Sequence, residues 1–189
     1  TADKTKALQI QARELGASTK YTAAEATDLQ IELAKLGFTA DEIQNSTKYV
    51  LRFAQATGAE LPEAAALAGA ALHMLNADTT ETERYVSAMA VSTTKSAMSF
   101  SYLSTALPIV GPVAKSFNFT IEDTLALLGK LSDSGFDASM AATATRNILL
   151  NLADSGGKLA TALGKPVRTL PELVEGLQKL KNEGVDLNT

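Results

Sequence analysis

The chain has 189 residues, of which 46% are hydrophobic, so it holds enough apolar material for one good-sized domain or two small ones. Charged residues make up 20% and the formal net charge is −4, which leaves no basic footprint for direct binding to nucleic acid or to an anionic membrane. Cysteine is absent and histidine occurs once, so the composition excludes disulfides and thiolate metal sites, and we expect no metal and no cofactor.

Apolar residues recur at steps of three and four along nearly the whole chain, which is typical of amphipathic helices. Leu29, Leu33 and Leu36 follow this pattern, and Leu125 and Leu128 follow it again further on. No stretch alternates with period two for long enough to predict a strand. The predicted helices are residues 4–15, 23–36, 40–57, 62–76, 81–97, 101–117, 121–134, 138–155 and 171–183.

The most apolar windows, residues 64–75 and 106–114, are too short to cross a bilayer, which takes roughly 20 apolar residues. The sequence therefore predicts no membrane span. The predicted helix at 62–76 pairs small residues four apart, as Ala65 with Gly69, so another helix can approach it closely within a buried core. The chain begins without methionine or a leader, and we expect it to be a piece of a longer protein.

One helix-start pattern occurs four times, in residues 19–26, 36–43, 117–124 and 134–141. Each copy has an aromatic residue and then Thr or Asp, whose side-chain oxygen can accept a hydrogen bond from the first helical turn. In three copies an acid three residues later can bond back to the cap, as in a capping box. The residues of the four helix starts are Tyr21, Thr22 and Glu25, then Phe38, Thr39 and Glu42, then Phe119, Thr120 and Asp123, and finally Phe136 and Asp137.

The connections between the predicted helices are short, so one helix stops and the next starts almost at once. Gly37 and Gly135 precede two of the aromatic residues, and glycine is common just past a helix end because it accepts positive φ. Short connections fold neighbouring helices back on each other. The sequence predicts an all-α fold, a compact multi-helix bundle of short antiparallel or orthogonal hairpins with no sheet.

Two further breaks divide the chain. Serines and threonines lower the helix propensity of residues 92–105, which predicts a break near Ser99. Pro108 and Pro112 predict that the next helix is kinked or begins late. Gly156 and Gly157 predict a hinge between a helical core, residues 1–155, and a small helical appendix, residues 156–189. The appendix either packs on the core or hangs from it.

Candidate catalytic residues are few. Ser92 and Lys95 have the S-x-x-K spacing of penicillin-recognising enzymes, but the KTG element of that family is missing, so we interpret them as a polar helix face. His73 has no second histidine, cysteine or acid at ligand spacing, which favours a packed or edge histidine over a metal ligand.

Two pairs of acids, Glu81 with Glu83 and Glu122 with Asp123, have the composition of a general acid and base. Their place in first helical turns explains them better, because negative charge there complements the helix dipole. The sequence contains no pattern that we interpret as catalytic, and it predicts a protein that is not an enzyme.

The order and spacing of these motifs resemble the core region of phage tail tape measure proteins of the TP901-related family. The resemblance covers most of residues 7–155 and is strongest in residues 11–43 and 112–153. After Gly157 the family's Asp-x-Asp-Gly-Asn turn is absent. The matching residues are Leu15, Gly16, Tyr21, Thr22, Glu25, Ala26, Gly37, Phe38, Thr39, Pro112, Val113, Ala114, Phe119, Thr120, Glu122, Asp123, Ala142, Arg146, Leu149 and Leu150.

The resemblance implies a structural, non-enzymatic segment from a phage or prophage. Such proteins assemble in the host cytoplasm, lie in the lumen of the virion tail, set tail length and leave ahead of the DNA. The implied partners are tail tube and tail assembly proteins, together with self-association of the full-length protein. Two alternatives remain: a helical protein-protein interaction domain of a cellular protein, and a cell-wall hydrolase, for which this segment lacks a polar, acid-rich cleft.

Overall fold

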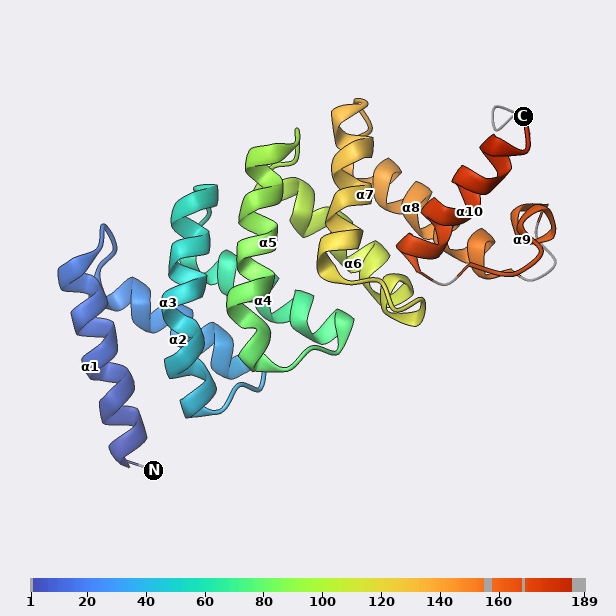
Figure 1. The fold of residues 1–189 in the computed structure, drawn as a ribbon. Helices are drawn as coiled ribbons and strands as arrows, with labels where there is room; N and C mark the ends of the chain where they lie inside the picture. The colour runs from blue at the N-terminus through green and yellow to red at the C-terminus, as the bar shows by residue number, and fades with distance from the viewer. Residues whose placement is uncertain (1, 155–157, 168, 185–189) are drawn as a thin grey trace.

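A computed structural model describes residues 2–154, 158–167 and 169–184 (Figure 1). These residues form helices and contain no strand, so the predicted all-α fold is confirmed. Nine of the ten described α-helices correspond to predicted ones, whereas α9 was not predicted. In chain order the elements are α1 (Ala2–Ser18), α2 (Ala23–Lys35), α3 (Ala40–Thr57), α4 (Leu61–Leu75), the 3-10 turn η1 (Thr79–Glu81), α5 (Thr82–Lys95), α6 (Phe100–Ser116), α7 (Ile121–Asp133), α8 (Ala138–Ala153), α9 (Lys158–Leu163) and α10 (Leu170–Asn182).

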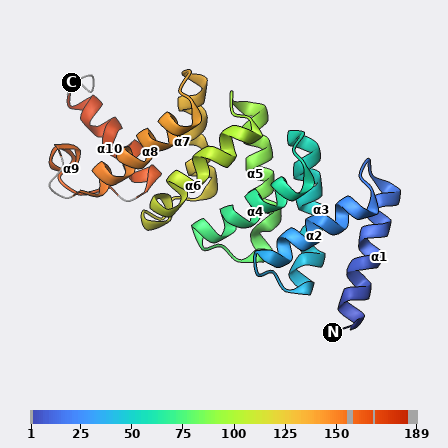
Figure 2. The same ribbon diagram turned by 180° about the vertical axis from the view of Figure 1, so that it is seen from behind.

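The helices stack as hairpins in two layers. The odd-numbered helices α1, α3, α5 and α7 form one layer, and α2, α4, α6 and α8 form the other, as the opposite views show (Figures 1 and 2). From α1 to α8, the extensive contacts join helices that are one or two places apart in the chain, with the exception of α5 and α6. The described chain therefore forms a linear array, with α1 at one end and α10 at the other (Figure 1).

The space between the layers holds one continuous cluster of buried side chains, which runs from Tyr21 to Leu149. Fully burying a side chain of this size stabilises the fold by about 1.5–3 kcal/mol, so the cluster is the main source of stability. Its largest fully buried members are Phe53, Leu29, Leu33, Leu51, Leu61, Met89, Leu103, Leu107, Ile121, Leu128 and Leu149.

α6 runs through both of its prolines. It begins at Phe100, where the Ser99 hydroxyl accepts a hydrogen bond of 3.1 Å from the Tyr102 amide. The predicted break near Ser99 is confirmed, and the alternative of a late helix start is wrong. Pro108 and Pro112 are both exposed. The helix carbonyls that lose their amide partner at each proline therefore lie on a side that water can reach.

Helices within a layer approach each other at glycines. Gly69 in α4 lies against Leu36, the residue that ends α2, and a Cβ at Gly69 would overlap the Leu36 side chain. Gly111 in α6 lies against Met74 in the last turn of α4, and a Cβ at Gly111 would come within 3.0 Å of Met74 Cβ. In both cases the end of one helix packs into the space that a missing side chain leaves on the next helix of the same layer.

The odd-numbered layer repeats this arrangement once. A Cβ at Gly129 in α7 would lie 3.3 Å from Ser96 Cβ and 3.4 Å from Met98 Cε, just after the end of α5. The contact is looser than the two contacts of the even-numbered layer. Consistent with that, a groove opens between α5 and α7 at this point.

α1 packs directly against the backbone at the start of α2. A Cβ at Gly16 would lie 2.5 Å from the backbone nitrogen of Ala23 and 3.0 Å from its Cα. Backbone atoms at the start of a capped helix cannot move aside as a flexible side chain can. Glycine at position 16 is therefore required by the packing of α1 on α2.

The C-terminal helices contain buried residues that lie outside the main core. α9 packs on α8, and α10 packs on α9. Ala160, Val167 and Leu180 are buried here but do not belong to the main cluster. The division at residue 155 remains a prediction, and the hinge predicted at Gly156 and Gly157 lies outside the described residues.

We expect Gly16→Ala to lower the free energy of unfolding by about 1–3 kcal/mol, the usual cost of forcing extra volume into a packed contact. Gly129→Ala is the matched control, because its new Cβ would meet only side-chain atoms at 3.3 Å or more. The gain in helix propensity there offsets the contact, so we expect a change within about 1 kcal/mol. Urea unfolding followed by circular dichroism measures both, and equal effects of the two substitutions would contradict this interpretation.

Candidate docking surfaces

Three of the four helix starts have complete capping boxes. The Thr39 hydroxyl accepts from the Glu42 amide at 3.4 Å, and the Thr39 amide donates to the Glu42 carboxylate at 2.6 Å. The pairs Thr22 with Glu25 and Thr120 with Asp123 bond in the same reciprocal way. At the fourth start, the Asp137 carboxylate accepts from the Met140 amide at 2.9 Å.

The same short segments also end the preceding helices. The Phe38 amide donates to the Leu33 carbonyl, and the Gly37 amide to the Ala34 carbonyl, with φ of 89° at Gly37. This is a Schellman motif, which satisfies carbonyls at the end of α2. The aromatic residue therefore closes one helix through its amide, directly before the residue that caps the next.

The later starts repeat this motif with small changes. The Phe119 amide donates to the Ala114 carbonyl, and Asn118 takes positive φ in place of glycine. The Phe136 amide donates to the Leu131 carbonyl, next to Gly135 at φ of 86°. The four starts lie at separate places along the array, so the residues predicted as motifs do not gather into one site.

The aromatic rings of the four starts differ in burial. Tyr21, Phe38 and Phe119 are 5–8% exposed and belong to the main core cluster, as a hydrophobic staple requires. Phe136, in contrast, is 39% exposed. The fourth copy therefore keeps the cap but leaves its ring at the surface, at the start of α8.

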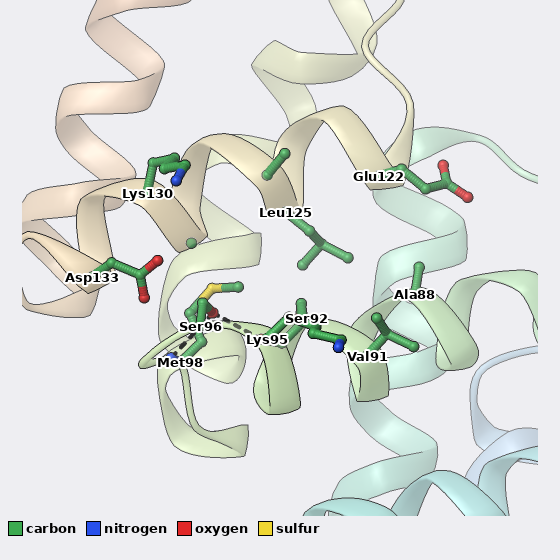
Figure 3. A pocket seen from close by; sticks show the side chains of 12 residues that line it. Ala88, Val91, Ser92, Lys95, Ser96, Met98, Glu122, Leu125, Lys130 and Asp133 are labelled. Carbon is green, nitrogen blue, oxygen red and sulfur yellow. Dashed lines mark hydrogen bonds between the residues drawn. The ribbon is translucent and has the colours of Figure 1, made fainter.

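The groove between α5 and α7 has a volume of about 340 Å³ (Figure 3). Leu125 points into it from α7, and Ala88 and Val91 face it from α5. Lys95 and Lys130 also line it, and so do Glu122 and Asp133, so the charges around the groove balance. Its chemistry favours an apolar side chain.

Ser92 and Lys95 both line this groove, but they are not arranged as a nucleophile and its base. The Ser92 hydroxyl donates to the Met89 carbonyl at 2.7 Å, a bond within its own helix. The hydroxyl is thereby directed at the backbone of α5, which supports the interpretation of these residues as a polar helix face.

The acids near this groove hold the array together. The Arg84 guanidinium on α5 donates to the Glu122 carboxylate on α7 at 2.8 and 2.7 Å, and to Glu81 at 2.8 Å. The hydrogen bonds that Arg84 donates hold the pKa of Glu122 below its ordinary value, and donation to the carboxylates of Glu122 and Glu81 raises the pKa of Arg84. Glu122 therefore serves as an ion-pair partner that joins α7 to α5, and Glu81 pairs with the same cation from three residues earlier in the chain.

His73 packs where α4 meets the α2–α3 connection. Its Nε2 lies 3.0 Å from the Leu36 carbonyl, and its ring meets the edge of Phe38 with centroids 6.5 Å apart. These contacts are those of a structural histidine. Within the described residues, no three His, Cys, Asp or Glu side chains form a group that could hold a metal ion.

The described helices include none that is both long enough and apolar enough to cross a bilayer. The helices form stacked hairpins. They are joined by stop-and-start motifs, the short segments at Phe38, Phe119 and Phe136 that end one helix and cap the next. These features define the chain as an all-helical array protein. The chain belongs to the family of phage-related minor tail proteins, which it matches over residues 9–187.

Two curated relatives are tape measure proteins. The chain is 34% identical over 157 residues to the probable tape measure protein of Escherichia phage P2, covering 83% of this chain and 19% of that protein. It is 28% identical over 153 residues to the tape measure protein of Pneumococcus phage Dp-1, covering 81% and 13% respectively. The chain thus spans less than a fifth of the length of either relative. No solved structure matches it.

These similarities confirm the resemblance to phage tail tape measure proteins that the helix-start motifs predicted. The finer assignment to the TP901-related group stays a prediction.

Glu42 makes the stability of the array depend on pH. Hydrogen bonds from the Thr39 hydroxyl, the Thr79 hydroxyl and the Thr39 amide hold the pKa of Glu42 below its ordinary value of 4.5. A lowered pKa in the folded state stabilises the fold above pH 4.5, and the contribution is lost as pH falls through the folded-state pKa. The bond of 2.7 Å from Thr79 also ties α3 to the segment that leads into α5.

We expect Glu42→Gln to lower the free energy of unfolding by about 1 kcal/mol at neutral pH, because glutamine keeps the capping-box acceptor but loses the negative charge that strengthens the hydrogen bonds to it. The difference from the natural chain should shrink as pH falls below 4.5. Glu60→Gln is the control, because Glu60 stands at the start of α4 without a side-chain cap bond. Urea unfolding at several pH values measures this, and a difference independent of pH would show that the carboxylate charge is unimportant.

Proposed function

We propose that this chain is a structural, non-enzymatic segment of a phage tail tape measure protein, acting in tail assembly, in length determination and in DNA ejection. The observation that carries the proposal is the similarity to two tape measure proteins over more than four fifths of the chain. The linear array supports it, because each added hairpin extends such an array by a fixed step.

The same similarity supports the proposed partners and location. The segment assembles with tail tube and tail assembly proteins in the host cytoplasm, associates with further copies of itself, and lies in the tail lumen of the virion. Ejection requires the protein to leave through a narrow tube. An array of hairpins held by neighbouring hairpins suits that passage, because it can open one hairpin at a time.

The test inserts one, two or four extra copies of residues 117–154 in frame, which contain α7, α8 and the cap of α7, into a phage that carries this segment. Two helices per copy preserve the alternation of layers. If the segment acts as stacked hairpins, each copy lengthens the tail by about 10 Å, the distance between packed helices. If it lies as one continuous helix, each copy adds about 57 Å at about 1.5 Å per residue.

We expect the first result, a total of about 40 Å for four copies, measured by electron microscopy of the tails. The series of copy numbers separates a change in length from a general effect of insertion on assembly. Normal tails of unchanged length with all three insertions would contradict a role of this segment in length determination.

A further inference from the structure

The even-numbered helices share one register, meaning the order of buried and exposed positions counted from the N-cap. The N-cap residues of α2, α4, α6 and α8 are Thr22, Glu60, Ser99 and Asp137, which follow one another at intervals of 38 or 39 residues. A repeated interval of this length is typical of arrays built from helix hairpins. Equivalent positions can therefore be compared between the four helices.

The positions seven and eleven residues after the N-cap belong to the core in the first three of these helices. None of the residues there is more than 5% exposed. They are Leu29 and Leu33 in α2, Leu67 and Ala71 in α4, and Ala106 and Val110 in α6. In α8 the same positions hold Ala144, which is half-buried, and Ile148, which is 42% exposed. The last helix thus keeps apolar residues in this register but leaves them uncovered.

The residue directly before the N-cap shows the same difference. Tyr21 and Met98, which precede the caps of α2 and α6, are 8% and 4% exposed. Ala59 before α4 is half-buried, whereas Phe136 before α8 is 39% exposed. Phe136 and Ile148 are therefore exposed at positions that the earlier hairpins cover.

The opposite flank of these helices shows which neighbour covers each position. Twelve residues after the N-cap, Leu72, Gly111 and Leu149 are buried. Gly111 lies against Met74 of the preceding even-numbered helix, so this flank faces the hairpin before it. Ala34 at the same position of α2 is exposed, because no even-numbered helix precedes α2 in the described chain. The positions that are exposed in α8, the last helix of its layer, accordingly face the place of the next hairpin (Figure 2).

We propose that a further helical hairpin of the same polypeptide covers Phe136 and Ile148 in the whole protein. The occupant is a helix with the register of α4 and α6, because in the earlier hairpins these positions are buried by such a neighbour. Every interface within the layer joins hairpins of one chain, so this contact continues an interface that the array already contains. The proposal concerns packing within one polypeptide, and it holds whether or not the segment contributes to tail length.

Related proteins contain enough chain to supply this hairpin. Both curated relatives extend well beyond the region that matches these 189 residues. The C-terminal helices of the described chain do not fill the place. α9 packs on α8, and α10 packs on α9, yet Phe136 and Ile148 keep the exposures given above. With six residues, α9 is also too short to carry the positions seven and eleven of this register.

Leu150 is the matched control on the same helix. It is 42% exposed, as Ile148 is, but it stands thirteen residues after the N-cap. That position is exposed in the other three helices of the layer, where it holds Lys35, His73 and Pro112. A single apolar side chain at such a position is ordinary for a protein surface. The proposal therefore predicts that Ile148 is covered in the whole protein and that Leu150 is not.

Cysteine labelling compares these two positions, because the segment has no cysteine of its own. In the 189-residue chain, Ile148→Cys and Leu150→Cys should react with a small maleimide at similar rates. In the whole protein of a phage that carries this segment, Ile148→Cys should react at least about tenfold more slowly, because the covering hairpin must open first. Leu150→Cys should keep its rate. Mass spectrometry of the labelled peptide separates both from any cysteine elsewhere in the longer protein, and an equal rate for Ile148→Cys in both proteins would overturn the proposal.

Dilution identifies the source of the cover. Protection by a hairpin of the same polypeptide does not depend on protein concentration. Protection that disappears on dilution would indicate a second copy, and protection that arises only in assembled tails would indicate another tail protein. Either of these results would overturn the proposal.

An added hairpin tests the register itself. A second copy of residues 117–154, inserted after residue 154 of the 189-residue chain, places a helix with the register of α8 next in the layer. Ile148→Cys in the first copy should then react at least about tenfold more slowly than without the insertion, and Leu150→Cys should react as before. Circular dichroism verifies that the inserted helices fold. An unchanged rate for Ile148→Cys beside a folded insertion would show that this position does not face the next hairpin.

Discussion

Close approach at glycine brings α4 against the end of α2 and α6 against the end of α4. The last residues of α2 and α4 pack against Gly69 and Gly111, each two helices further along the chain. A larger residue at Gly69 or Gly111 would have to displace the side chain of Leu36 or Met74 from this contact. Between the layers, the hydrophobic cluster is continuous from Tyr21 to Leu149.

The combined stop-and-start motifs complement these contacts. At Phe38 a single segment of four residues ends α2, turns the chain and caps α3. Such a short connection forces each helix to fold back on the previous one. Repetition of this step, together with the glycine contacts, produces a line of hairpins in which the extensive contacts join near neighbours.

Local features of this fold can be predicted from the sequence because they depend on hydrogen bonds between residues three or four apart. The caps at Thr22, Thr39 and Thr120 are of this kind, and so is the start of α6 at Ser99. α9 was missed because its six residues, directly after Gly156 and Gly157, are too few to show a period.

Tertiary features were harder to predict. Alanine and glycine spacing in α4 indicated a close approach, but the partner at Gly69 is Leu36, which no local pattern identifies. The exposed ring of Phe136 breaks the rule that the other three starts obey, although its sequence fits the same pattern. The sequence shows that α8 contains a single charged residue, Arg146. It does not show which side of that helix faces the core.

An array held by near neighbours should open in parts, and this property links the fold to passage through a narrow tail. Native-state hydrogen exchange at increasing denaturant measures it directly. We expect opening free energies to be highest in α3 to α6, which have helices packed on both sides, and to fall in steps towards α1 and towards α9 and α10. A single opening free energy shared by all protected amides would mean that the chain unfolds as one unit, and would contradict the hairpin-by-hairpin array.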